Sequence, residues 1–279
     1  MVESELRPEG FHQPSALQGG RPPKPRATLG HLQREVLEMK KFVIALLATA
    51  MLIALLPTAG LALSPYSEDF ESLNQADTSA LGNAGWLVFG NVFGPAWDYW
   101  YGYGVFPAPN DGAAFCAIAT GEGGAAQGSQ QLSIYNDYNN ANHGDGSNAH
   151  IESNVFQEQV VGPADVGETW VFAFDAKLGN LVSPSTALAF IKTLDPNAGY
   201  ATTNFLTMDM TGASSTWGSY SISIYIDASL VGQLMQIGFS STASNYDPSG
   251  VFYDNLVLYR SVVVGDEDAS WGEVKSLFR

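Results

Sequence analysis

The chain has 279 residues, of which 46% are hydrophobic and 14% charged, and its formal net charge is −16. This acidic balance disfavours binding to nucleic acid and to anionic membranes, and it favours cations and neutral ligands. Cys116 is the single cysteine, so no intrachain disulfide can form, and its apolar flanks predict a small buried side chain.

The first 62 residues are predicted to precede the folded domain. Residues 1–38 are rich in Pro, Gly and Arg without apolar periodicity, so we interpret them as upstream of the translation start or, if translated, as disordered. Residues 39–62 have the make-up of a signal peptide, with a Met-Lys-Lys start, an apolar run over 42–56 and small residues through Ala62. A membrane-spanning helix needs about 20 apolar residues and is disfavoured. We expect cleavage after Ala62, a secreted or periplasmic location without stable membrane insertion, and a mature formal charge of −18.

The region 63–262 is dominated by β-strand patterns. Apolar and polar residues alternate over 168–176, 219–226 and 233–240, and clusters of Gly, Asn, Asp, Ser and Pro separate the candidate strands. No helical period lies between them, which argues against a parallel α/β sheet. These patterns predict one all-β domain, a two-sheet antiparallel β-sandwich with a single core. The predicted core residues of the three alternating strands are Trp170, Phe172, Phe174, Ile222, Ile224, Met235, Ile237 and Phe239.

The strand pattern over 251–259 contains a carboxylate in a row of hydrophobic residues. With a period of two, Asp254 shares a face with Phe252, Leu256 and Leu258. A carboxylate among core-facing apolar side chains is costly unless it is paired or holds a metal. Asp254 is therefore a candidate metal ligand.

Two long segments and a tail complete the pattern. Segments 94–112 and 136–149 exceed the usual loop length, and loops of this length are usually functional or disordered. The second is rich in Asn and Asp but lacks the spacing of an EF-hand, and turn chemistry explains its composition equally well. Apolar residues recur at helical spacing near the end of the chain, so 263–279 is expected to be an acidic linker and a short C-terminal helical tail.

Three short motifs together resemble one group of proteins. They are Phe70-Glu71 at the first strand, Gly85-Trp86 soon after it, and Tyr253-Asp254-Asn255-Leu256 in the last strand. Over 64–262 the chain is similar to carbohydrate-binding modules of the families four, nine and twenty-two group, which are galactose-binding-like β-sandwich jelly rolls that often carry one structural calcium.

The resemblance implies a calcium ion held by Glu71 and Asp254. Asp69 could help, and backbone carbonyls would complete the six to eight oxygen ligands that calcium takes. The alternative from the residues alone is an exposed Glu71 and an Asp254 that makes hydrogen bonds to a turn.

Five aromatic residues gather in the segment 94–112, and they are Trp97, Tyr99, Trp100, Tyr101 and Tyr103. Sugar rings present C–H faces that stack on aromatic planes, so such a segment suits a neutral glycan. The same rings could instead fold back onto the core. Gln157 and Gln159 could offer amide hydrogen bonds on the outer face of their strand, or could simply be solvated.

Catalytic signatures are weak in this sequence. No carboxylate pair stands out, and nucleophile elbows, His-Glu-Xaa-Xaa-His helices and phosphate-binding glycine loops are absent from the sequence. We therefore predict a secreted, non-catalytic domain that binds a neutral polysaccharide or glycan and uses one structural calcium. Two alternatives stay open: an extracellular structural or adhesive domain without a glycan site, and a polysaccharide-degrading enzyme on a jelly-roll scaffold.

Overall fold

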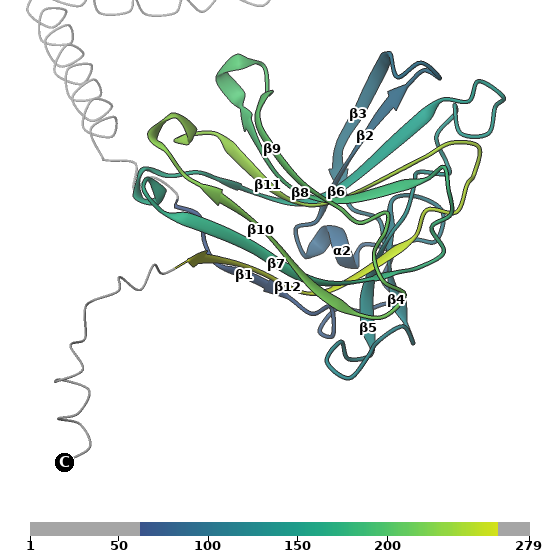
Figure 1. Cartoon of the computed structure of the whole chain (residues 1–279), viewed down its shortest axis with the longest axis horizontal. Helices are drawn as coiled ribbons and strands as arrows, with labels where there is room; N and C mark the ends of the chain where they lie inside the picture. Colours follow the sequence, from purple (N-terminus) through teal and green to yellow (C-terminus); the bar gives the residue numbers. More distant parts are fainter. Residues whose placement is uncertain (1–61, 262–279) are drawn as a thin grey trace, which may run out of the picture. The chain divides into compact units, whose positions relative to one another are not determined.

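The computed structural model describes residues 62–261, which form a sandwich of two six-stranded antiparallel sheets (Figure 1). One short helix, α2 (Ala80–Asn83), lies between the first two strands in sequence. The strands are β1 (Tyr66–Glu68), β2 (Leu87–Phe93), β3 (Tyr99–Pro107), β4 (Cys116–Thr120), β5 (Gln130–Ile134), β6 (His150–Val160), β7 (Thr169–Leu178), β8 (Thr186–Asp195), β9 (Ala201–Asp209), β10 (Gly218–Tyr225), β11 (Leu234–Ala243) and β12 (Val251–Ser261).

The chain passes back and forth between the two sheets, so neighbouring strands of a sheet are often distant in sequence. Sheet A has the order β10-β7-β12-β5-β4, with β1 pairing on β12, and sheet B has the order β3-β2-β6-β11-β8-β9. One edge of β12 pairs with β7, and its other edge is shared by β5 and β1. The predicted all-β sandwich of two antiparallel sheets is confirmed.

The core lies between sheets A and B. All eight side chains that alternation predicted to be buried belong to one hydrophobic cluster. At its centre Phe239 stacks on Tyr253 with ring centroids 3.6 Å apart, and Phe174 meets Phe239 edge to face at 5.2 Å. Burying one such ring stabilises the fold by roughly 2–3 kcal/mol, so interdigitated aromatic residues from both sheets hold the sandwich together.

Strand β12 departs from the predicted period of two because it contains a bulge. Its register with β7 shifts just after Asp254, and Asn255 has a φ of 49°. Asparagine adopts this left-handed conformation more readily than most residues, which suits it to a bulge. Tyr253 and Leu256 consequently both face the core, while the half-buried Phe252 faces outward. The predicted face shared by Phe252 and Leu256 is wrong for this reason.

Several predicted segments lie outside the described residues. These are the upstream segment, the signal peptide and the helical tail. Within 62–261, no helix is both long enough and apolar enough to cross a membrane.

Candidate functional site

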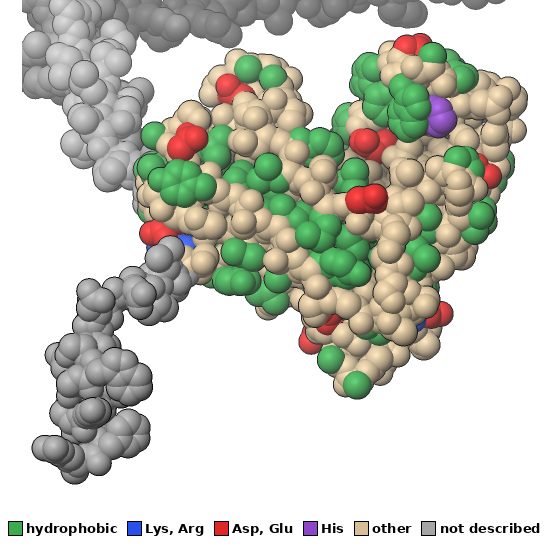
Figure 2. Space-filling view, in the orientation of Figure 1, with side chains coloured by type: hydrophobic (Ala, Val, Ile, Leu, Met, Phe, Trp, Pro, Cys, Tyr) green, Lys and Arg blue, Asp and Glu red, His purple; other side chains and the backbone are tan. Residues whose placement is uncertain are grey.

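The outer face of sheet B forms a groove. The β2–β3 and β8–β9 hairpins rise on either side of the sheet, and the molecular surface is notched between them (Figures 1 and 2). The hollow has a volume of about 600 Å³, and its lining comes from β2, β3, β6, β8, β9, β11 and the β8–β9 turn. This volume lies within the range of about 300–1,000 Å³ typical of small-molecule sites.

Aromatic side chains lie in the floor of the groove, as Phe156 does, or beside it in sheet B, as Phe190 does. Phe156 and Phe190 are fully buried but do not belong to the core cluster between the sheets. They flank Gly238 on the intervening strand β11. A Cβ atom at Gly238 would lie 2.1 Å from the carbonyl oxygen of Val155, so glycine is required where β6 approaches. Tyr200, at 60% exposure, stands on the β8–β9 side.

Amide side chains in the groove are oriented by carboxylates. Asn91 and Asn154 each donate from Nδ2 to Glu152 Oε1 over 2.8 Å. Gln236 likewise donates from Nε2 to Glu158 Oε2 over 2.8 Å. Each of these bonds uses one N–H of the amide and fixes its orientation, and the amide oxygens of Asn91 and Gln236 are left as acceptors.

Two polar atoms beneath the groove lack protein partners. Asn154 Oδ1 and Ser240 Oγ are buried without a hydrogen bond, and the two residues face each other across β6 and β11. An unpaired buried polar atom costs about 1–3 kcal/mol, so this position between β6 and β11 favours a hydrogen-bond partner such as a buried water.

Lys192 adds a positive charge beside the rings. Its ammonium group lies 4.8 Å from the ring centroid of Phe190 and 4.7 Å from that of Phe205. Burial lowers the pKa of Lys192, and the nearby Glu152 charge partly opposes that change. No carboxylate of the described residues forms an ion pair with this ammonium group, so it can donate hydrogen bonds to a ligand.

The predicted aromatic loop is a strand with two faces. Residues 99–107 of segment 94–112 form β3, so the expectation of one long loop is wrong. Tyr101 and Tyr103 project away from the groove, donating hydrogen bonds to Asn142 (2.8 Å) and Asp137 (2.7 Å), respectively. The register shift between Val92 and Phe93, which leaves Trp100 without a paired residue on β2, therefore divides the aromatic cluster that the sequence presented as one group.

Three of the predicted rings form an exposed ledge at the tip of the β2–β3 hairpin. Trp97, Tyr99 and Trp100 are 58%, 59% and 42% exposed, respectively. Trp97 stacks on His150 at 4.1 Å, and both Trp97 and Tyr99 contact Phe93. Phe93 follows Asn91 on the same face of β2, so the ledge continues the outer face of sheet B beyond the groove.

Gln157 does not face the groove. It shares the core-side face of β6 with Val155, and its Nε2 donates to the carbonyl oxygen of Ala84 (3.0 Å) and to the Tyr66 hydroxyl (3.3 Å). The expected outward orientation is therefore wrong. Gln157 ties β6 to the N-terminal segment and the turn after α2.

Asp254 is a fully buried carboxylate with one unsatisfied oxygen. Its Oδ1 accepts a hydrogen bond from the Asn255 backbone (2.6 Å), whereas Oδ2 has no partner. Burial raises the pKa of Asp254 to about 7; the Asn255 hydrogen bond opposes this rise, while the charges of Asp69, Glu71 and Asp175 add to it. Asp254 thus offers an unpaired carboxylate oxygen close to other negative charges. Oxygen ligands of this kind are the ones that calcium takes.

The neighbouring acids already have protein partners. Glu71 Oε1 accepts hydrogen bonds from the backbone of Ser129 and Gln130, each over 2.6 Å. Asp175 accepts from Asn255 Nδ2 over 2.9 Å. Among residues 62–261, no group of three or more His, Cys, Asp or Glu side chains could hold a metal ion. An ion at Asp254 would therefore depend on backbone carbonyls and water as well.

The groove residues were not predicted as site residues from the sequence, although the sequence contains a pattern that indicates them. Glu152, Asn154, Phe156 and Glu158 alternate along β6, and this mixed polar and aromatic face indicates a surface that is neither plain core nor plain solvent. Their partners on β2, β8 and β11 could not be paired with them without knowledge of the strand order.

Comparisons with known proteins give only distant likenesses. No protein-family model matches the chain, and no curated protein matches it. Solved structures similar to it include the CBM22-1 xylan-binding domain of Paenibacillus barcinonensis Xyn10C, with a TM-score of 0.36 and 11% identity over 72% of this chain and 97% of that one. The CBM22-1–GH10 modules of Clostridium thermocellum xylanase 10B give 0.38 and 10% over 74% of this chain, and the tailspike protein 4 domain of bacteriophage CBA120 gives 0.39 and 12% over 68%.

The chain spans only 29% of the xylanase structure and 21% of the tailspike structure. With TM-scores below 0.5 and identities near one tenth, these three likenesses carry no argument about what this chain binds.

Proposed function

We propose that this protein binds a neutral polysaccharide in the groove of sheet B. The observation that carries the proposal is the pairing of ring faces with oriented amides on one concave surface. Phe89 and Tyr200 offer apolar faces for sugar C–H groups, and Asn91 and Gln236 offer amide oxygens for hydroxyls. The predicted signal peptide would bring this groove to polysaccharides outside the cell.

The aromatic ledge would lengthen the binding surface. Trp97, Tyr99 and Trp100 lie along the same outer face, beyond Asn91 and Phe93. A short oligosaccharide would occupy the groove alone, whereas a longer chain would also stack on the ledge. Sugar stacking needs no charge, so binding would persist at high salt.

The arrangement of acids supports binding over glycoside hydrolysis. Glu152 and Glu158 lie six residues apart on β6, which corresponds to about 20 Å along a strand. Catalytic carboxylates of glycosidases are about 5–10 Å apart. Both residues also accept hydrogen bonds from amide side chains, which suits a structural role.

An adhesive domain without a glycan site has less support. Such a surface would not need a hollow of about 600 Å³ lined by rings and oriented amides.

We also propose that Asp254 helps to hold one structural calcium ion. Its unpaired Oδ2 and the neighbouring negative charges support a cation there, and Asp69 and Glu71 are the nearby acids that could contribute. A bound calcium would supply positive charge that stabilises the ionised Asp254 and fixes the first and last strands together.

Affinity electrophoresis in gels containing neutral polysaccharides tests the groove. We expect Tyr200→Ala to weaken retardation about 5- to 10-fold, since loss of one stacking ring corresponds to about 1–1.4 kcal/mol. Tyr225→Ala is the matched control, because Tyr225 is 61% exposed but lies on β10 of sheet A. The proposal would be contradicted if both variants were retarded as strongly as the unmodified protein. It would also be contradicted if no polysaccharide retarded the unmodified protein.

A further inference from the structure

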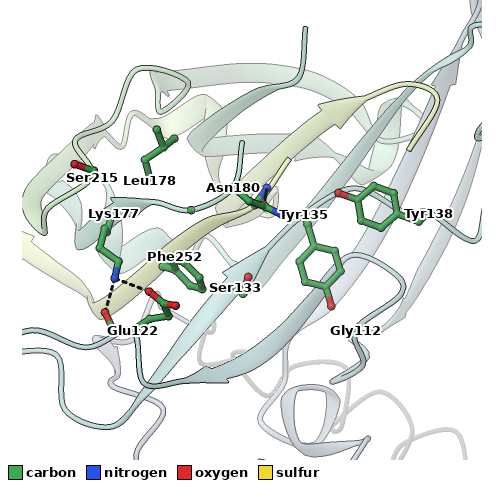
Figure 3. A pocket seen from close by; sticks show the side chains of 12 residues that line it. Gly112, Glu122, Ser133, Tyr135, Tyr138, Lys177, Leu178, Asn180, Ser215 and Phe252 are labelled. Carbon is green, nitrogen blue, oxygen red and sulfur yellow. Dashed lines mark hydrogen bonds and ion pairs between the residues drawn. The ribbon is translucent and has the colours of Figure 1, made fainter. Parts of the chain in front are cut away.

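A second hollow, of about 640 Å³, lies on the outer face of sheet A (Figure 3). Ser133, Phe252 and Lys177 form a row across β5, β12 and β7, because Phe252 pairs with Ser133 on one side and Lys177 on the other. The neighbours of Phe252 in β12 face the core, so this row points away from it. The hollow and the groove therefore open on opposite sides of the sandwich.

The centre of the hollow combines a ring with a paired donor and acceptor. Lys177 Nζ lies 5.3 Å from the ring centroid of Phe252 and 2.8 Å from Glu122 Oε2 (Figure 3). Lys177 also donates to the Glu122 carbonyl oxygen (2.7 Å), as does Trp217 Nε1 (3.0 Å), so the loop carrying Glu122 is fixed. An ammonium beside a carboxylate matches two adjacent sugar hydroxyls, one accepting and one donating.

The opposite wall is also built from oriented groups. The rings of Tyr135 and Tyr138 are parallel within 4°, and the Tyr138 hydroxyl is held by Ser249 Oγ at 2.6 Å. Asn180 Oδ1 accepts a hydrogen bond from the Gly250 backbone (2.9 Å), which leaves its amide nitrogen to donate into the hollow. Each of these groups is held by the protein before any ligand arrives.

We propose that this hollow is a second saccharide site, which takes one or two units of a neutral glycan. The ring faces suit the C–H surface of a sugar, and the polar groups offer both donors and acceptors. An anionic ligand such as a phosphate fits poorly, since Lys177 is the only Lys or Arg of the lining and is already paired with Glu122. Two sites on opposite faces would let one protein molecule join two polysaccharide chains.

A site-resolved titration tests the second site separately from the groove. Cellotetraose, xylotetraose and mannotetraose would be added to the ¹⁵N-labelled protein, up to about 10 mM, a range that reaches weak specific binding. We expect saturable shifts of the backbone amides of Gly179 and Gly250 with at least one of them. The shifts should persist in Tyr200→Ala, which alters only the groove. If these amides do not move with any of the three probes, the second site is overturned, whatever the groove does.

Two variants of modest size separate recognition from folding. Glu122→Gln and Asn180→Ala should each lower the affinity measured from the shift of the Gly250 amide by about threefold or more. This is the change expected from the loss of one hydrogen bond. Glu168→Gln is the matched control, because Glu168 is similarly exposed and paired with Arg260 outside the hollow. Melting temperatures of all three should stay near that of the unmodified protein. Equal weakening by Glu168→Gln, or none by Glu122→Gln and Asn180→Ala, would overturn the proposal.

Discussion

Replacing Asp254 by Asn should stabilise the metal-free protein at neutral pH. In the unfolded chain the pKa of this carboxyl is near its ordinary value of 3.8, and in the fold burial raises it to about 7. Between these values the native state holds a proton that the unfolded state has lost. Stability therefore falls as pH rises from about 4 to about 7, by about 1.4 kcal/mol per pH unit. The whole window amounts to about 4 kcal/mol, which Asp254→Asn would recover at pH 8.

Urea unfolding in chelator, at pH values from 5 to 8, measures this effect. The unmodified protein should lose stability between pH 5 and about pH 7 and then level off, and the difference between it and Asp254→Asn should grow over the same window. Asp227→Asn is a control at an exposed Asx turn, where a comparable growth of the difference with pH is not expected. A constant difference between Asp254→Asn and the unmodified protein across this range would refute the reasoning.

Calcium should reverse the order of the two proteins. A cation that binds only the folded state stabilises it, and it favours the ionised form of Asp254. In excess calcium at pH 8, the unmodified protein should melt at a higher temperature than in chelator, whereas Asp254→Asn should not respond. Identical melting curves of the unmodified protein in calcium and in chelator would count against the metal.

Two further predictions concern aromatic side chains. Tyr253→Phe should be neutral or stabilise the fold by about 1 kcal/mol in urea unfolding, because the buried Tyr253 hydroxyl has no hydrogen-bond partner and the stacking on Phe239 is kept. A loss above about 1 kcal/mol would mean that the hydroxyl is satisfied by water. The double variant Trp97→Ala, Trp100→Ala should leave the melting temperature nearly unchanged, since both rings are exposed. It should reduce the retardation by long polysaccharides more than it reduces the affinity for tetrasaccharides. Unfolding of the double variant would instead assign these rings to the core.

The architecture could be predicted from the sequence because alternation is strong where one strand face is buried. Strands β7, β10 and β11 each place large apolar residues at every second position, and these positions meet in one core. Burial and period-two geometry are local consequences of the sequence, so no knowledge of strand order was needed.

The candidate sites were harder to predict because they depend on pairing and on local irregularity. The bulge at Asn255 reverses the faces of the residues that follow it in β12, which a strict alternation cannot anticipate. The groove brings Asn91, Glu152 and Lys192 together from three strands distant in sequence. Gln157 faces inward because Ala84 and Tyr66 are brought within reach of β6 by the tertiary fold.

Strand β3 forms one edge of sheet B and presents eight exposed residues out of nine, none of them charged. An apolar edge of this length is a template on which another copy could extend the sheet. Its pairing with β2 shifts register twice, after Val88 and after Val92, so only a short stretch between the shifts is regular. Such irregularities twist an edge away from a straight partner and thereby limit self-association. A straight β3 would therefore expose a regular, uncharged sheet edge on which a second copy of the protein could pair and aggregate.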